Sequence, residues 1–106
     1  MWVFLKGGHF LSAVAHDSKR GVVLVRARRS ADLEALGVPE HTPRADYAWR
    51  IEVPQKRWAR WLALQAKHID YPNFKDTVTD DDRHRACMDV WWSMLALQRP
   101  ELFEWD

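Results

Sequence analysis

Several kinds of residue are scarce in this chain of 106 residues, and each scarcity excludes a class of structure or site. A single cysteine excludes an internal disulfide and a zinc site built from several cysteines. Only four glycines are present, and neither a P-loop nor a Gly-x-Gly-x-x-Gly motif occurs. No apolar run reaches the roughly 18 residues that span a membrane, and Gly7-Gly8 interrupts the apolar start too early for a signal peptide. We therefore expect a cytoplasmic protein with no membrane association and no cofactor.

Catalytic signals are equally scarce. No serine lies in a Gly-x-Ser-x-Gly elbow, and the apolar helical setting of Cys87 predicts a buried, inert thiol. His84 follows Asp80 and Asp81 at helical spacing, but acids at a helix start serve the helix dipole, so we predict no metal site. We expect no catalytic residues, and keep as an alternative a small hydrolase or nuclease with its site near residues 70–75.

Tryptophan is abundant, with seven residues in a chain that is 47% apolar and 29% charged. This composition predicts one globular domain over residues 1–106, with residues 99–106 as a loosely docked tail. Each indole can bury roughly 150–250 Å², so we expect most of the tryptophans in the core. Trp2, Trp92 and Trp105 fall on no clear apolar stripe and suit a binding surface instead.

The net charge of +1 conceals two oppositely charged parts. Residues 1–69 carry 12 Lys and Arg against 6 Asp and Glu, a charge of +6, whereas residues 70–106 carry −5. Such asymmetry indicates either a basic binding surface or two parts that attract each other when packed. We favour the second interpretation.

Alternating apolar residues predict a sheet. Gly7-Gly8 is a hairpin signal, and Gly21 is suited to a turn with positive φ. Ser30 is expected to cap a short helix over residues 31–36, which Gly37 ends. Within residues 22–28 and 46–53, apolar side chains including Tyr47 share one face. The predicted strands are residues 2–5, 10–15, 22–28 and 46–53.

Two long helices follow. One starts after Pro54, with an apolar stripe of Trp58, Trp61, Leu62, Ala66 and Ile69. The other starts near Asp80, and its predicted buried stripe consists of Cys87, Met88, Trp91, Met94 and Leu95. The element order is β-β-β-α-β-α-α. We predict an α+β fold in which a four-stranded, mainly antiparallel sheet carries both long helices on one face.

Two basic strips are candidates for binding nucleic acid directly. One lies on the sheet face away from the helices, provided that its strands are neighbours, and the other lies on the first long helix. Arginine and lysine beside aromatic rings suit backbone contact and base stacking. The strips are Arg26, Arg28 and Arg50 on the sheet, and Lys56, Arg60 and Lys67 on the helix.

The interpretation we prefer is a non-catalytic binding domain for a protein or nucleoprotein partner. Trp92 follows Trp91 directly, and one helix cannot direct both rings into a single core. This favours a protein partner, a homodimer contact or the C-terminal tail folding over Trp92.

The segment between the long helices is the most distinctive part of the chain. Asp70, Tyr71, Asn73, Phe74 and Lys75 lie close together there and form a candidate pocket or structural motif. We favour the structural role, in which the two rings anchor the turn and the polar side chains bond the local backbone.

Several segments together resemble one family. They include Met1-Trp2-Val3-Phe4, Leu24-Val25-Arg26-Ala27-Arg28 and Ala45-Asp46-Tyr47-Ala48-Trp49-Arg50, and the most specific is the Asp-Tyr-x-Asn-Phe-Lys element that starts at Asp70. The chain resembles a family of small uncharacterised proteins of bacteria and their phages over most of residues 1–98. The resemblance implies no catalytic residue or cofactor, and its phage context favours a regulatory or anti-defence role.

Overall fold

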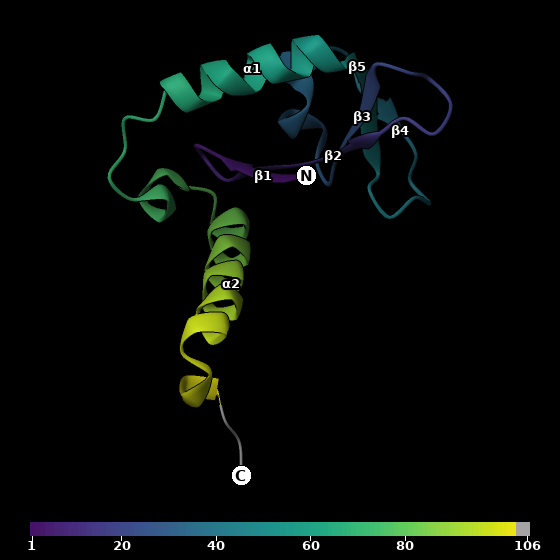
Figure 1. Ribbon diagram of the computed structural model, residues 1–106. Coiled ribbons are helices and arrows are strands. Elements are labelled where there is room, and N and C mark those ends of the chain that lie inside the picture. Colours follow the sequence, from purple (N-terminus) through teal and green to yellow (C-terminus); the bar gives the residue numbers. More distant parts are fainter. Residues whose placement is uncertain (104–106) are drawn as a thin grey trace. The chain divides into compact units, whose positions relative to one another are not determined.

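The protein has an α+β fold with a five-stranded antiparallel sheet and two long helices, labelled in Figure 1. The computed structural model describes residues 1–103. The chain divides into two compact units, the first of residues 1–5 and 9–70, the second of residues 6–8 and the chain from Tyr71 onward. The predictions made for Trp105 and for the end of the tail lie outside the described residues, and the predicted single domain stays a prediction.

The sheet belongs to the first unit, and each strand pairs antiparallel with its neighbours in the order β1-β2-β3-β5-β4. The predicted count of four strands is wrong, because the pair Glu40–His41 adds a fifth. So short a polar strand carries no alternating apolar signal, and the His41 ring stacks on Trp49 of β5 at 4.2 Å between centroids. The strands are β1 Trp2–Leu5, β2 His9–Ala15, β3 Val22–Ala27, β4 Glu40–His41 and β5 Trp49–Pro54.

The turns between these strands depend on glycine where φ is positive. A three-residue loop joins β1 to β2, in which Gly7 has φ 88° and Gly8 has φ 86°, and Gly21 has φ 74° before β3. The predicted helix over residues 31–36 is instead two 3-10 turns, η1 (Ser30–Asp32) and η2 (Glu34–Leu36), and Ser30 does not cap it. Both turns are too short to form an α-helical hydrogen-bond ladder.

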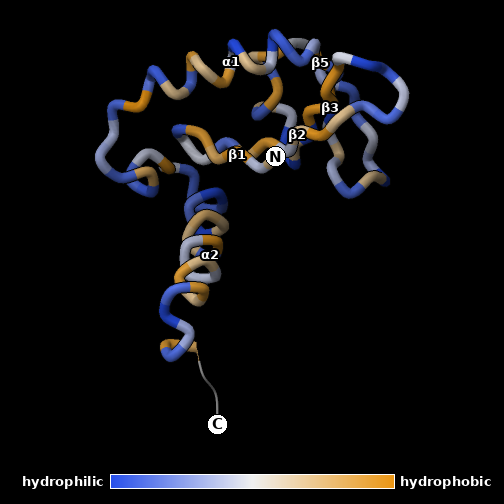
Figure 2. The backbone as a smooth tube through the Cα atoms, viewed as in Figure 1, coloured by the Kyte–Doolittle hydropathy of each residue, from blue (hydrophilic) through white to orange (hydrophobic). Residues whose placement is uncertain are grey.

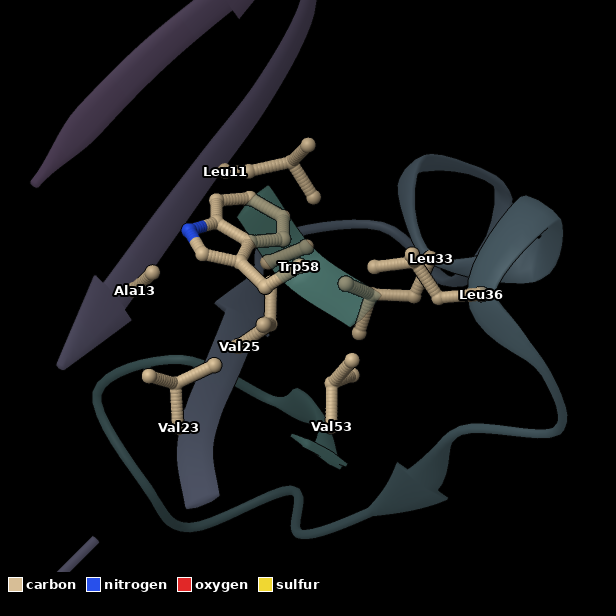
Figure 3. Close-up of a cluster of buried hydrophobic side chains, with 9 residues drawn as sticks. Leu11, Ala13, Val23, Val25, Leu33, Leu36, Val53 and Trp58 are labelled. Atoms are coloured by element: carbon tan, nitrogen blue, oxygen red, sulfur yellow. The ribbon is translucent and has the colours of Figure 1, made fainter. Parts of the chain in front are cut away.

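The core of the first unit lies between the sheet and helix α1, Gln55–Lys67. Figure 3 shows the buried side chains of this core. Val23, Val25 and Ala27 of β3 all point into it, so the predicted face of that strand is confirmed. Trp58 is the α1 side chain that enters the core, at 5% exposure. The buried cluster consists of Leu11, Ala13, Val23, Val25, Ala27, Leu33, Leu36, Val53 and Trp58.

The apolar stripe of α1 is shorter than predicted. Trp61 and Leu62 are half-buried against the core, but Ala66 is exposed and Ile69 lies beyond the helix end with 59% exposure. The helix therefore covers the sheet with its first two turns. Of the two helices predicted to share one face of the sheet, α1 packs there; α2 belongs to the second unit, and its predicted packing stays a prediction.

The second unit contains η3 (Phe74–Thr77), α2 (Asp81–Gln98) and η4 (Pro100–Phe103). Asp80 caps α2 by accepting the N–H of Arg83 at 2.9 Å. The Arg83 guanidinium donates to the carbonyl of Gly8 at 3.1 Å, and the N–H of Gly7 donates to Thr77 Oγ1 at 3.0 Å. Backbone groups of the 6–8 loop are thus satisfied by the start of α2 and by η3.

Helix α2 is much less buried than its sequence predicts, and apolar positions recur along its length in Figure 2. Cys87 is buried and Met88 and Leu95 are half-buried, but Trp91 and Met94 are exposed, which corrects the predicted stripe. The expectation that most tryptophans lie in the core is also wrong for the six that the structure describes, of which one is buried, two are half-buried and three are exposed. Periodicity identifies an apolar face and cannot show whether the chain itself supplies a surface to cover it.

Candidate functional site

The open face of the sheet, opposite the core, carries a row of polar residues. Arg26 on β3 is the direct cross-strand partner of Arg50 on β5, and Ser12 on β2 is the partner of Arg26 on its other side. The conditional prediction that Arg26 and Arg50 lie together is therefore met by the register. Two like charges directly opposite each other normally destabilise a sheet. We call Ser12, Arg26 and Arg50 the arginine row.

The ring of Tyr47 packs against the guanidinium groups of two arginines on this face. The guanidinium carbon of Arg26 lies 4.5 Å from the Tyr47 ring centroid, and that of Arg28 lies 4.0 Å from it. Arg28 also pairs with the Asp46 carboxylate at 2.9 Å. Tyr47 precedes β5 and lies among the arginines, so the prediction that it shares one face with the other apolar side chains of residues 46–53 is wrong. The chain turns before β5 begins, and strand alternation does not extend to it.

Neither arginine of the pair forms an ion pair within the part of the chain that the structure describes, although Glu40 on β4 is the cross-strand partner of Arg50. Arg26 donates from Nη2 to Ser12 Oγ at 2.8 Å, and Arg50 donates from Nη2 to the Tyr47 carbonyl at a long 3.4 Å. The Nε atoms of both side chains are buried without a hydrogen-bond partner. An unmade buried hydrogen bond costs about 1–3 kcal/mol. The row therefore contains two buried donors whose hydrogen bonds are not made.

Aromatic rings adjoin the row on the β1–β2 side. Phe10 stacks on Phe4 at 4.7 Å, meets Trp2 edge-on at 6.1 Å and lies 6.4 Å from Tyr47, all between ring centroids. Trp2 is the cross-strand partner of Ser12, which places it at the end of the arginine row. Its side chain is 73% exposed. Cationic donors and an exposed indole thus share one sheet face.

A hollow of about 740 Å³ lies on the other side of the row, toward the β2–β3 turn. Val14, Leu24 and Val38 supply apolar walls, and Arg50 lines the hollow as well as belonging to the row. Thr42 also lines it, and its Oγ1 is buried without a hydrogen-bond partner among the described residues. The hollow therefore combines an apolar lining with polar groups of both charges, which include Asp17, Glu40 and Glu52.

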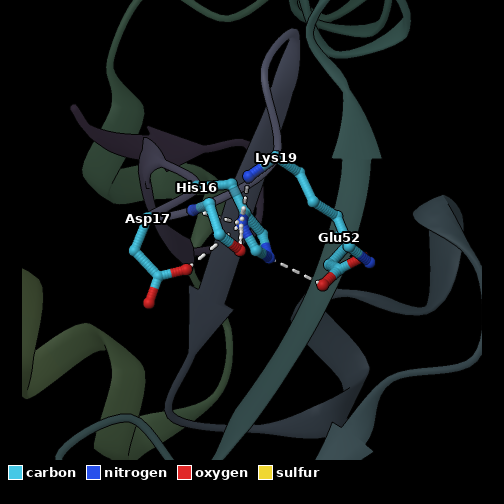
Figure 4. A network of polar contacts seen from close by, with 5 residues as sticks. His16, Asp17, Lys19 and Glu52 are labelled. Carbon is cyan, nitrogen blue, oxygen red and sulfur yellow. Dashed lines mark hydrogen bonds and ion pairs between the residues drawn. The ribbon is translucent and has the colours of Figure 1, made fainter.

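A histidine network closes the edge of this hollow (Figure 4). His16 Nδ1 accepts the N–H groups of Ser18 at 3.1 Å and Lys19 at 2.9 Å, so the ring proton lies on Nε2, which donates to Glu52 at 2.8 Å. Lys19 Nζ also donates to Glu52 at 2.8 Å. The hydrogen bond from Lys19, and then that from His16, lowers the pKa of the Glu52 carboxyl below its ordinary value. This network was not predicted from the sequence. The turn-forming residues after His16 were the one sequence feature that could have indicated a side chain bonded to the turn.

A second pair that sequence reasoning missed joins His9 to Asp32 at 2.6 Å. The Asp32 side chain is buried and that of His9 is 42% exposed. A buried carboxylate that orients a histidine is one part of a general-base arrangement. Among the residues described, no hydroxyl or thiol hydrogen-bonds to His9, so the pair connects η1 to β2 without forming a nucleophilic site.

The second basic strip lies elsewhere on the first unit. Lys56, Arg60 and Lys67 are exposed on α1, which packs against the core face of the sheet, whereas the arginine row lies on the opposite face. The two predicted strips therefore do not form one surface. The structure brings Arg26, Arg28 and Arg50 together and leaves the lysine strip apart from them.

Trp92 lies on α2 with 47% exposure, and its ring meets Trp91 at 5.0 Å and Phe103 of η4 at 5.9 Å. A protein partner, a homodimer contact or the C-terminal tail was expected to cover Trp92. The structure shows a contact from the C-terminal segment, through Phe103. That contact leaves both indoles largely exposed.

The 70–75 segment contributes mainly local contacts. Asn73 Oδ1 accepts the N–H of Lys75 at 3.0 Å and caps η3, and the rings of Tyr71 and Phe74 lie 6.3 Å apart. Lys75 Nζ lies 4.5 Å from the Trp91 ring centroid. Asp70 is exposed and is the last residue of the first unit. These contacts favour the structural interpretation of the segment.

Comparisons with known proteins found no match: no protein family, curated protein or solved structure matches the chain. Within residues 1–103, no three His, Cys, Asp or Glu side chains are arranged to hold a metal ion. The same part of the chain contains no helix whose length and hydropathy suit a membrane crossing.

Proposed function

We propose that this chain is a non-catalytic binding domain that contacts single-stranded nucleic acid, free or within a nucleoprotein, through the open face of its sheet. The observation that carries the proposal is the Arg26–Arg50 pair, two direct cross-strand partners. Neither forms an ion pair in the described chain, although Glu40 on β4 is the cross-strand partner of Arg50 on its other side. A sheet that keeps two unpaired guanidinium groups side by side gains stability when a phosphate binds between them.

The aromatic rings favour a single strand over a duplex. Trp2 is exposed at the end of the arginine row, and Phe4 and Phe10 lie beside it. Unpaired bases can stack on such rings, whereas the bases of a duplex are already stacked. Arg28 extends the cationic surface next to Tyr47. The proposed surface therefore combines backbone contact with base stacking.

Fluorescence anisotropy tests this proposal with a labelled mixed-sequence single strand and the matching duplex at low salt. We expect the single strand to bind, and a variant with both Arg26→Gln and Arg50→Gln to bind at least about tenfold more weakly, a loss of about 1.4 kcal/mol. The matched control carries Lys56→Gln and Arg60→Gln, which remove the same charge from α1. Equal losses in the two variants, or no binding at low salt, would contradict the proposal.

A protein partner is the second candidate function, and the exposed apolar side chains of α2 favour it. Val90, Trp91, Met94 and Leu97 recur at helical spacing and are 39%, 42%, 59% and 78% exposed. We propose a second copy of this chain as the partner, because an antiparallel pair of α2 helices would place the acidic start of one, at Asp81, beside Arg99 of the other.

Sedimentation velocity over a concentration series tests this second proposal. The expected result is a dimer that Met94→Lys dissociates, while Arg60→Gln, which leaves α2 intact, has no effect. A monomer at every concentration would exclude self-association and leave a different protein as the partner of this helix face.

The cellular location and the regulatory role are proposed from the sequence alone. A cytoplasmic, regulatory role among small bacterial and phage proteins agrees with the family resemblance and with a binding domain that lacks catalytic motifs. A hydrolase or nuclease site near residues 70–75 has less support, because Asn73 and Lys75 are engaged in local contacts.

A further inference from the structure

We infer that the hollow beside the arginine row is a binding site for one nucleobase, whose own phosphate lies on Arg26 and Arg50. This inference rests on the proposed function and adds to it the part of the nucleic acid that is recognised. The hollow, its unpartnered polar atoms and its position next to the row carry it.

The size and walls of the hollow suit a flat heterocycle. Its volume of about 740 Å³ lies within the range of roughly 300–1,000 Å³ typical of small-molecule sites. Val14 and Leu24 form its floor on β2 and β3, and Val38, which is 94% exposed, stands at its edge. Aliphatic side chains of this kind pack against the faces of a base, whose removal from water is favourable.

Two polar side chains that line the hollow have an atom without a partner. Thr42 and Arg50 both line the hollow, and each has a buried polar atom, Oγ1 and Nε, without a partner in the described chain. Buried polar groups normally have partners, so two such atoms beside one hollow indicate a ligand that supplies hydrogen bonds after a small adjustment. Three carboxylates also line the hollow, those of Asp17, Glu40 and Glu52. Glu52 is already held by Lys19 and His16, and Glu40 is the cross-strand partner of Arg50.

The spacing of the sheet allows one nucleotide to place its base in the hollow and its phosphate on the arginine row. Leu24 lies two residues from Arg26 on β3, and Val14 lies two residues from Ser12 on β2, so the floor of the hollow is the next row on the same face. Residues two apart on a strand are separated by roughly 6–7 Å. A base in the hollow therefore lies next to its phosphate on the arginine row, and the following base lies toward Phe10 and Trp2.

Amide chemical shifts of the ¹⁵N-labelled protein test the inference, with inorganic phosphate, ribose 5-phosphate, cytidine 5′-monophosphate and a single-stranded oligonucleotide as probes. We expect phosphate and ribose phosphate to shift the amides of Arg26 and Arg50 alone. The nucleotide and the strand should shift those amides together with the amides of Val14, Leu24 and Thr42. A free nucleotide as effective as the strand would identify the ligand as a mononucleotide, which supports the base site.

The variant Val14→Phe fills the hollow and leaves the arginine row unchanged. Strand binding should weaken roughly tenfold, the loss of one base contact, while the response to inorganic phosphate is retained. The inference fails if the nucleotide and ribose phosphate shift the same amides, or if the folded variant binds the strand as well as the wild type does. If the inference fails but the strand still shifts the amides of Arg26 and Arg50, the proposed function stands. If the strand does not shift those amides, the proposed function fails together with the base site.

Discussion

Arg26 and Arg50 face each other across β3 and β5. Neither forms an ion pair in the described chain, although Glu40 on β4 is the other cross-strand partner of Arg50. The Arg26 guanidinium donates one hydrogen bond to Ser12, and that of Arg50 donates one to the Tyr47 carbonyl. Directly opposed like charges destabilise a sheet, and a half-buried position reduces their screening by salt. The pair is therefore a stability cost in the free protein that an anion relieves.

The variant Arg50→Gln should make the free protein more stable. Removing one of two opposed charges is expected to raise the free energy of unfolding by about 0.2–1 kcal/mol, which urea denaturation at low salt measures. Inorganic phosphate should stabilise the wild type more than this variant, because it binds the folded pair. The control Arg60→Gln removes an exposed α1 charge and should change neither quantity. A clear loss of stability in Arg50→Gln would contradict the account.

Glu52 predicts how stability changes on acidification. Its pKa is lowered in the folded protein, first by the Lys19 hydrogen bond and then by that of His16, so its carboxylate form is favoured by folding. That contribution is present above the ordinary pKa of a glutamate and is lost as the pH falls through the lowered value. Glu52→Gln should be less stable than the wild type at neutral pH, with a difference that shrinks in strong acid. Urea titrations at several pH values measure it.

The control for this pH series is Glu34→Gln on η2. This variant makes the same chemical change at an exposed position and shows how much of the stability difference any glutamate-to-glutamine substitution produces. A Glu52→Gln difference that stays constant down to strong acid would show that the carboxylate contributes nothing through these two hydrogen bonds.

Gly8 and Gly21 form a matched pair for testing the packing of the 6–8 loop. Both have positive φ, so alanine at either position costs about 1–2 kcal/mol in backbone strain. A Cβ on Gly8 would lie 2.8 Å from Val78 Cγ1, whereas a Cβ on Gly21 meets no atom within 4 Å. Gly8→Ala should therefore be the more destabilising change in thermal or urea unfolding. Equal losses would show that Val78 does not pack against the loop as described.

Cys87 should react slowly with thiol reagents in the folded protein. Burial raises the pKa of its thiol, more than the nearby Arg83 lowers it, and the side chain is 8% exposed. The reactive thiolate is therefore scarce at neutral pH, and the stability linked to the protonated thiol is lost only as the pH rises through the raised value. Labelling should be fast in denaturant and slow without it. Rapid labelling of the folded protein at neutral pH would contradict this.

Much of the sheet was predictable because local rules determine it. The faces of β3 follow from the alternation of Val23, Val25 and Ala27 with Leu24 and Arg26, and the turns follow from glycines that take positive φ. The fifth strand was not predictable, since two polar residues carry no periodic signal. Nor were η1 and η2, because apolar spacing over six residues does not distinguish an α-helix from two 3-10 turns.

The sequence predicted the faces on which the site residues lie, but it did not predict the register that brings them together. Alternation places Arg26 and Arg50 each on a face, but only the pairing of β3 with β5 makes them direct neighbours. The pairs His9–Asp32 and His16–Glu52 join residues 23 and 36 positions apart, which no local pattern connects. The exposure of Trp91 and Met94 depends on which surfaces the rest of the chain supplies, and periodicity does not contain that information.

The most direct test of the central claim is the salt dependence of single-strand binding in the wild type, Arg50→Gln and Arg60→Gln. Each phosphate contact adds about −0.7 to the slope of log K against log salt for a single strand. If Arg50 contacts phosphate from the open face of the sheet, its variant should lose about 0.7 of that slope, and Arg60→Gln should keep the wild-type slope. Equal slopes for the wild type and Arg50→Gln, or a loss confined to Arg60→Gln, would contradict the account.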